Sequence, residues 1–89
     1  MINVLFFASL REKLNCESVS LSLGRTDELA TDISTVADVK ARLIELHPDW
    51  QVHFRNSALL NAVNQQMADN SCRISDGDEV AFFPPVTGG

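Results

Sequence analysis

The sequence predicts an α+β fold in which one main helix packs on one face of a mixed sheet of four to five strands. Segments near both ends of the chain alternate between apolar and polar residues as strands do, and one segment between them has helical spacing. With 89 residues, of which 45% are apolar and 21% charged, the chain has the composition of one small globular domain. We expect the domain to span residues 1–83 and to continue into an extended tail, residues 84–89.

The first two expected strands, residues 2–9 and 17–23, are predicted to form a hairpin. One face of residues 2–9 is purely apolar and should meet the core: Ile2, Val4, Phe6 and Ala8. The other face carries Leu5 and Phe7 among polar neighbours, so it should stay uncovered. Residues 17–23 alternate serine with apolar residues, as a half-exposed strand does. Between the strands, residues 11–15 are expected to form a polar connection or a helical turn.

The main helix is predicted between Thr35 and Pro48, after an acidic surface loop at residues 24–34. Thr35 can act as N-cap with Asp38 at the third helical position, a capping-box arrangement, and Pro48 should end the helix. Its apolar stripe should be formed by Val36, Val39, Leu43 and Leu46. The residues expected to face water are Lys40, Arg42 and Glu45.

The second half of the chain predicts a short strand and a final strand. Residues 49–58 favour no regular element, although Trp50 and Phe54 should close one end of the core. A short strand at residues 59–64 and a turn or hairpin through residues 65–67 follow. An Asp-Gly turn at residues 75–78 leads into the last strand, residues 79–83. This order is typical of a β-grasp arrangement, with the first and last strands central and parallel.

That arrangement brings Phe7 and Phe83 together on the uncovered face of the sheet. Because monomers seldom leave large apolar groups clustered in water, the pair is a candidate partner-binding patch. The alternative is that either ring lies in the core, since strand parity can slip by one residue. Met67 is a candidate for the same surface, or a simple core or turn methionine. Arg11 is a candidate for an intermolecular salt bridge, or a solvated loop arginine.

Composition excludes several classes of function. A net charge of -5 argues against nucleic acid and anionic membranes as partners and favours a basic surface or channel. The apolar N-terminus lacks the layout of a signal peptide, so we expect a cytoplasmic protein. Cys16 and Cys72 lie far apart and are expected to be reduced thiols. His47 and His53 have no acidic or cysteine companions, so we expect no metal site.

The last residues, 84–89, read Pro-Pro-Val-Thr-Gly-Gly. Pro84 and Pro85 should end sheet pairing and send the chain out as a stiff spur, since proline has no backbone N–H. Gly88 and Gly89 make the tip thin enough to enter a narrow channel. Six residues can reach roughly 20 Å when extended. The alternative interpretation is an ordinary frayed terminus.

Three segments together resemble the MoaD family, the ubiquitin-like sulfur carriers that form the small subunit of molybdopterin synthase. They are residues 4–12 (VLFFASLRE), 62–65 (AVNQ) and 76–89 (DGDEVAFFPPVTGG). The resemblance covers nearly the whole chain in order. The sequence departs from short family members mainly in its longer acidic segment at residues 24–34.

The resemblance implies a role in sulfur delivery. An adenylating enzyme of the ubiquitin-activating type would use ATP to activate the carboxyl group of Gly89, and sulfur would replace AMP to give a thiocarboxylate. The large synthase subunit, expected in a heterotetramer of two small and two large subunits, would bind Phe7, Arg11, Met67, Phe83, Pro84 and Pro85. Its buried site would receive Val86, Thr87 and Gly88 together with Gly89. No cofactor is expected on this chain itself, and catalysis would come from the partner.

Two other classes of function stay open at this point. One is a related carrier with another destination, such as thiamine sulfur transfer or attachment to lysines as a ubiquitin-like modifier. The other is a non-catalytic β-grasp interaction module whose tail is incidental. The FFPPVTGG ending at residues 82–89 favours the synthase subunit over both.

Overall fold

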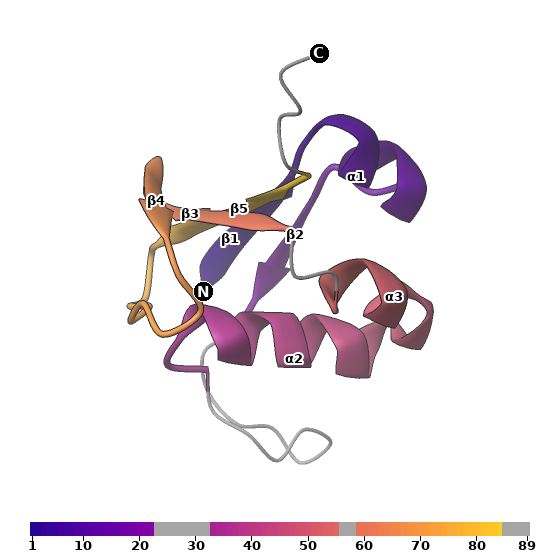
Figure 1. Ribbon diagram of the computed structural model, residues 1–89. Helices are drawn as coiled ribbons and strands as arrows, with labels where there is room; N and C mark the ends of the chain where they lie inside the picture. The colour runs from indigo at the N-terminus through magenta and orange to yellow at the C-terminus, as the bar shows by residue number, and fades with distance from the viewer. Residues whose placement is uncertain (23–32, 56–58, 85–89) are drawn as a thin grey trace.

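The computed structural model describes residues 1–22, 33–55 and 59–84 (Figure 1). Most of the expected acidic loop and tail residues 85–89 therefore lie outside the described residues. A five-stranded sheet has the order β2-β1-β5-β3-β4. Its strands are β1 (Ile2–Phe6), β2 (Ser18–Leu21), β3 (Leu60–Val63), β4 (Gln66–Ala68) and β5 (Glu79–Phe83). β1 and β5 are parallel and the other pairs antiparallel, which confirms the predicted mixed sheet and its N-terminal hairpin.

The helices lie on one side of the sheet and at one end of it (Figure 1). They are α1 (Ala8–Leu14), α2 (Val36–Leu46), the 3-10 helix η1 (Pro48–Trp50) and α3 (Gln51–Phe54). α2 crosses one face, and α3 follows at its end. The predicted main helix is thus confirmed as α2, and the segment for which no regular element was expected contains η1 and α3.

Of the two alternatives expected for residues 11–15, a polar connection or a helical turn, the helical one is nearer, because α1 occupies Ala8–Leu14. The strand ends at Phe6, and Ala8 adopts a left-handed backbone conformation with φ of 55°, which turns the chain into the helix. Leu10 and Leu14, one helical turn apart, are both buried and hold α1 against the core. Ala8 was expected on the core face of a strand but is exposed at the start of α1.

The capping box predicted for α2 is confirmed. The Asp38 carboxylate accepts from the backbone N–H of Ser34 and of Thr35, each at 3.0 Å, and the Thr35 hydroxyl accepts from the Asp38 N–H at 3.3 Å. These bonds satisfy backbone donors that a helix start otherwise leaves free. The helix ends at Leu46, directly before the His47–Pro48 junction.

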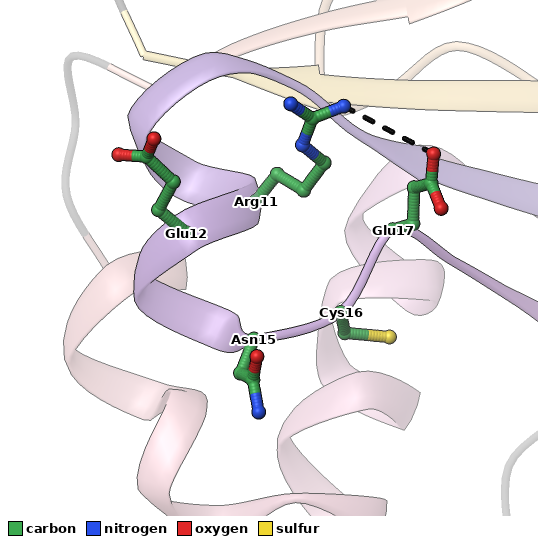
Figure 2. Close-up of a pocket in the computed structure, with 5 residues that line it drawn as sticks. All are labelled: Arg11, Glu12, Asn15, Cys16 and Glu17. Atoms are coloured by element: carbon green, nitrogen blue, oxygen red, sulfur yellow. Dashed lines mark ion pairs between the residues drawn. The ribbon is translucent and has the colours of Figure 1, made fainter.

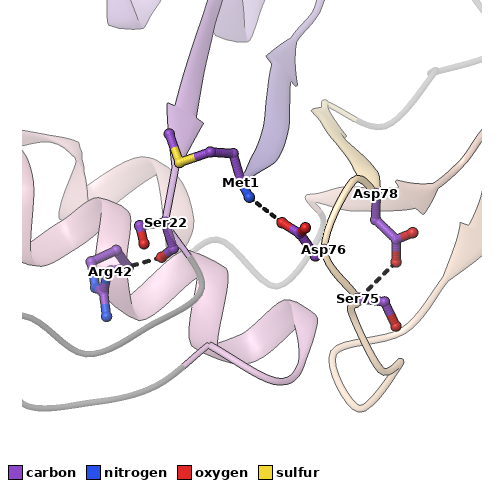
Figure 3. A network of polar contacts seen from close by, with 6 residues as sticks. All are labelled: Met1, Ser22, Arg42, Ser75, Asp76 and Asp78. Carbon is purple, nitrogen blue, oxygen red and sulfur yellow. Dashed lines mark hydrogen bonds and ion pairs between the residues drawn. The ribbon is translucent and has the colours of Figure 1, made fainter.

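Two residues of α2 were assigned to the wrong face. Leu46 is 46% exposed, whereas Arg42 is only 4% exposed. The Nη1 of Arg42 donates to the carbonyl oxygen of Ser22 at 3.4 Å (Figure 3). Its Nε lies 4.0 Å from Oε2 of Glu45, so the buried charge has polar partners. The buried apolar stripe of α2 therefore consists of the first three residues of the expected set, Val36, Val39 and Leu43, and does not include Leu46.

The core lies between α2 and the covered sheet face. It contains the alternate residues of the two parallel strands, all at 0–1% exposure: Ile2, Val4, Phe6, Val80 and Phe82. Trp50 and Phe54 close its end as predicted. The ring centroids of Trp50 and Phe6 are 5.4 Å apart, and those of Phe54 and Phe82 are 5.3 Å apart. These edge-to-face contacts add to the burial that stabilises so small a domain.

The turn before β5 links the N-terminal ends of the two parallel strands, β1 and β5. Gly77 has φ of +88° and donates its N–H to the carbonyl oxygen of Met1 at 2.9 Å. The N-terminal amine of Met1 also pairs with the carboxylate of Asp76, and Asp78 accepts from the backbone N–H of Ser75 at 2.8 Å (Figure 3). The predicted Asp-Gly turn thus sets the register in which β5 enters the sheet beside β1.

Candidate functional site: the uncovered sheet face

The face of the sheet opposite α2 carries a continuous apolar row. Strand register pairs Leu5 with Ala81, Ala81 with Ala62, and Ala62 with Met67. Directly paired residues point to the same side of a sheet, and successive residues point to opposite sides. Since Val80 and Phe82 face the core, this row faces away from it.

A second row lies beside the first, at the end of the sheet where β5 stops. Phe83 pairs with Leu60 on β3, and both are partly buried. Phe7 follows Phe6, which pairs with Phe82, and its extended backbone continues the strand direction by one residue. We call the two rows the open face, defined by Leu5, Phe7, Leu60, Ala62, Met67, Ala81 and Phe83.

The open face contains three of the residues singled out from the sequence. Phe7 and Met67 are 45% and 65% exposed, and Phe83 is partly buried. Among the ring contacts of the described residues, Phe7 and Phe83 do not stack on each other, so each ring presents its own surface. Leu60 and Ala62 were not singled out, because only the β3–β5 register shows that they share this face.

Arg11 lies on α1 rather than on a polar connection. Its guanidinium Nη1 is 4.0 Å from the Glu17 carboxylate, and both side chains are more than half exposed (Figure 2). The two groups border an open hollow that Glu12, Asn15 and Cys16 also line. An exposed pair at this distance contributes little to stability, so Arg11 can exchange Glu17 for another acceptor.

Pro84, the first residue of the expected tail, lies between α1 and α3. Pro84, the last described residue, is partly buried and lines a groove with Leu10, Lys13, Val52 and His53. Pro85, Val86, Thr87, Gly88 and Gly89 lie outside the described residues. The position of Pro84 next to Phe83 means that the tail starts at the edge of the open face.

Other candidate chemistry is sparse in the described ranges. Residues 1–22, 33–55 and 59–84 hold no group of three or more His, Cys, Asp or Glu side chains that could bind a metal ion. His47 instead stacks on Trp50, with ring centroids 3.9 Å apart. Cys16 and Cys72 are free, partly buried thiols. In the same part of the chain, no helix has the length and apolar character needed to cross a membrane.

Comparison with known proteins decides the family. The sequence profile of the ThiS family matches residues 4–89. The chain belongs to the ThiS family. This ThiS-family chain is 39% identical over 89 residues to the molybdopterin synthase sulfur carrier subunit of Escherichia coli, and the match covers 100% of both chains. It is 36% identical, again over 100% of both, to the protein of the same name from Haemophilus influenzae.

Solved structures confirm the β-grasp fold of this ThiS-family chain. SAMP1 from Haloferax volcanii matches with a TM-score of 0.76 and 25% identity, over 99% of this chain and 98% of that one. A complex of subunits 1 and 2 of the molybdopterin-converting factor from Helicobacter pylori contains a chain that matches with a TM-score of 0.62 and 23% identity, over 99% and 97%. The resemblance drawn from the sequence is therefore confirmed at the level of family and fold.

Proposed function

We propose that this ThiS-family chain is the sulfur carrier subunit of molybdopterin synthase. The observation that carries the proposal is its end-to-end match, at 39% identity, with the Escherichia coli protein of that name. The match runs through the final residues, Gly88 and Gly89, to which the carrier chemistry is assigned. We propose that the chain acts in the cytoplasm, where the enzymes that load and use the carrier would also act.

The reacting group in this proposal is the carboxylate of Gly89. A free α-carboxyl group has a pKa of about 3.5 and is an unreactive anion at neutral pH, so it needs activation. Its oxygen attacks the α-phosphorus of ATP on an adenylating enzyme, which expels pyrophosphate and leaves an acyl-adenylate. A persulfide sulfur then attacks the acyl carbon and expels AMP. Cleavage of the resulting acyl disulfide by a thiol leaves the thiocarboxylate.

The open face supplies the proposed docking surface for the large subunit. Phe7 and Met67 present exposed apolar area on a rigid sheet, which is typical of residues that anchor an interface. Arg11 and the two prolines, Pro84 and Pro85, flank this surface, and the tail beyond them enters the partner's site. The large subunit would then use the thiocarboxylate sulfur to build the dithiolene of molybdopterin on a cyclic pyranopterin monophosphate.

The partners follow from the same chemistry. The Helicobacter pylori structure is a complex of subunits 1 and 2 of the molybdopterin-converting factor, which supports a large subunit as partner here. We propose a heterotetramer of two small and two large subunits, and an adenylating enzyme that uses ATP. The sulfur carrier itself binds no cofactor in this proposal.

Reconstitution tests the proposal. The purified chain, its adenylating enzyme, ATP, a persulfide donor, the large subunit and the pyranopterin precursor should together yield molybdopterin. A matched chain with one extra residue after Gly89 should yield none, because its acyl carbon is no longer terminal. If the extended chain supports synthesis as well as the original chain does, the carrier role is wrong.

A second candidate is a protein modifier attached to lysines. The structural match to SAMP1 of Haloferax volcanii, which a second crystal structure names small archaeal modifier protein 1, favours this candidate. The two functions differ after adenylation, because a modifier forms an amide with a lysine whereas a carrier forms a thiocarboxylate. Tryptic peptides of other proteins in which a lysine carries residues 74–89 of this chain, the segment after its last tryptic site at Arg73, would support the modifier.

A further inference from the structure

A second polar pocket lies on the side of the sheet that α2 covers, away from the open face. It has a volume of about 400 Å³ and opens beside the β3–β4 edge. Lys40 from α2, Arg55 after α3, Asn61 from β3 and the pair Asp69 and Asn70 after β4 line it. Asn61 pairs with Phe82 in the β3–β5 register, which places its side chain on the core side.

Asn61 helps to hold the wall of this pocket through its hydrogen bond to Asn70. The residue is 6% exposed, and its Nδ2 donates to the carbonyl oxygen of Ala68 at 3.4 Å and to Asn70 Oδ1 at 3.3 Å. Among the described residues its Oδ1 has no partner. Reversing the amide would set its oxygen against two other oxygens, so this orientation is fixed. The Oδ1 atom is itself buried, so its missing hydrogen bond is a cost inside the fold and not a contact offered to a ligand.

Lys40 brings a positive charge that has no ion-pair partner among the described residues. Its Nζ donates to Asn70 Oδ1 at 2.7 Å and lies 5.9 Å from the ring centroid of Phe82. Neither contact is an ion pair, and burial lowers the pKa of the Lys40 amine. In the described ranges Arg55, which is exposed, also has no ion-pair partner. The pocket thus presents two cations in a chain whose net charge is -5.

Asp69 compensates these cations only in part. Its carboxylate accepts from the backbone N–H of Ser71 at 2.9 Å and from the Ser71 hydroxyl at 2.6 Å, within its own turn. These two bonds lower the pKa of Asp69, the hydroxyl bond most, so the group stays ionised at neutral pH. Its negative charge on the wall disfavours a phosphate dianion and is tolerated by a singly charged carboxylate.

We propose that this pocket binds an acidic segment of a partner protein, with a Glu or Asp carboxylate between Lys40 and Arg55. The carboxylate supplies the ion-pair partner that the partly buried Lys40 lacks among the described residues. Phe54 and Leu59 line the same pocket and offer apolar contact to the methylene groups of a glutamate side chain. Because the pocket and the open face lie on opposite sides of the sheet, both can be occupied at once.

The test is an NMR titration of the isotope-labelled full chain with the peptide Ac-Ser-Gly-Glu-Glu-Gly-Ser-NH2. The expected result is saturable shifts at the Asn61 side-chain amide and at Lys40 and Arg55, with a raised pKa of the Lys40 amine in the bound state. Lys40→Met and Arg55→Gln should each weaken binding at least about fivefold, the loss of one charged contact. Lys13→Met, a matched change on α1, should leave binding unchanged.

Three results would overturn the proposal. The first is equal binding of the peptide in which both glutamates are glutamines. The second is the same loss from Lys13→Met as from Lys40→Met, which would reveal a diffuse charge effect. The third is inorganic phosphate that displaces the peptide at equal concentration, which would indicate a general anion site. None of these outcomes depends on sulfur transfer, so the test stands apart from the proposed function.

Discussion

The backbone N–H of Phe7 donates a hydrogen bond to the carbonyl oxygen of Phe82, with 3.2 Å between nitrogen and oxygen. This bond extends the parallel β1–β5 ladder by one residue before α1 begins. It holds Phe7 beside Phe83 at the point where β5 ends and Pro84 starts the tail. The open face and the base of the tail are therefore parts of one rigid surface.

Phe7→Ala should weaken binding to the large subunit by about tenfold or more, because an exposed ring on the open face is a typical interface anchor. Folding should be nearly unaffected, since the bond to Phe82 uses the backbone of Phe7. Isothermal titration calorimetry and urea denaturation measure the two effects. Leu46→Ala is the matched control, because Leu46 is 46% exposed against 45% for Phe7 but lies on α2. Equal loss of affinity in both variants would rule out the open face as the docking surface.

Leu43→Ala should destabilise the domain by about 2–5 kcal/mol, because it opens a cavity at a fully buried position. Leu46→Ala, one turn further along α2, should cost less than about 1 kcal/mol because its side chain is already half in water. Urea denaturation measures the difference in free energy of unfolding, from the midpoints of the two variants at the same dependence of that free energy on urea concentration. Similar midpoints for the two variants would contradict the assignment of Leu43 to the buried stripe of α2 and of Leu46 to its exposed side.

Asp38→Asn should destabilise the protein at neutral pH and have little effect in acid. Hydrogen bonds to the carboxylate, the backbone bond from Ser34 most and then that from Thr35, lower the pKa of Asp38 in the folded state. The stabilisation is therefore present above the unfolded pKa of about 3.9 and is lost as the pH falls through the lower folded value. Thermal unfolding between neutral pH and strong acid measures it. Asp49→Asn on η1 is the control, and a difference for Asp38→Asn that persists in acid would contradict the account.

Gly77→Ala should cost about 1 kcal/mol, because a residue with a Cβ is strained at φ of +88°. No atom lies within 4 Å of an added Cβ, so the loss would arise from backbone strain and not from a clash. Gly77→Asn should cost less, since asparagine tolerates positive φ better. Urea denaturation of the two variants checks this order, and an alanine variant as stable as the original would show that the turn can relax.

The architecture could be predicted from the sequence where local signals agree with burial. Thr35, Asp38 and Pro48 give both ends of α2, and Gly77 gives the turn into β5. The helix α1 was indicated only as a helical turn, because its two core residues, Leu10 and Leu14, stand among charged neighbours and make too short a pattern. Arg42 was misplaced because helical spacing does not show that Ser22 lies close enough to accept from a buried guanidinium.

The candidate sites depended on long-range pairing to different degrees. Alternation on two strands was enough to predict Phe7 and Phe83 on one surface, since both strands are regular and parallel. Leu60 and Ala62 joined that surface only through the register of β3 with β5. The Lys40, Arg55 and Asn61 pocket had no sequence signal, because its residues come from separate elements that only the folded chain brings together.

The central claim is that Gly89 carries sulfur, and the intact mass of the chain tests it most directly. The chain is incubated with its adenylating enzyme, ATP and a persulfide donor, and the chain with one added residue after Gly89 is treated in parallel. The account predicts replacement of one oxygen by sulfur at Gly89 in the first chain and no change in the second. Sulfur on the extended chain, or no sulfur on the original chain while the same enzyme loads the Escherichia coli relative, would contradict it.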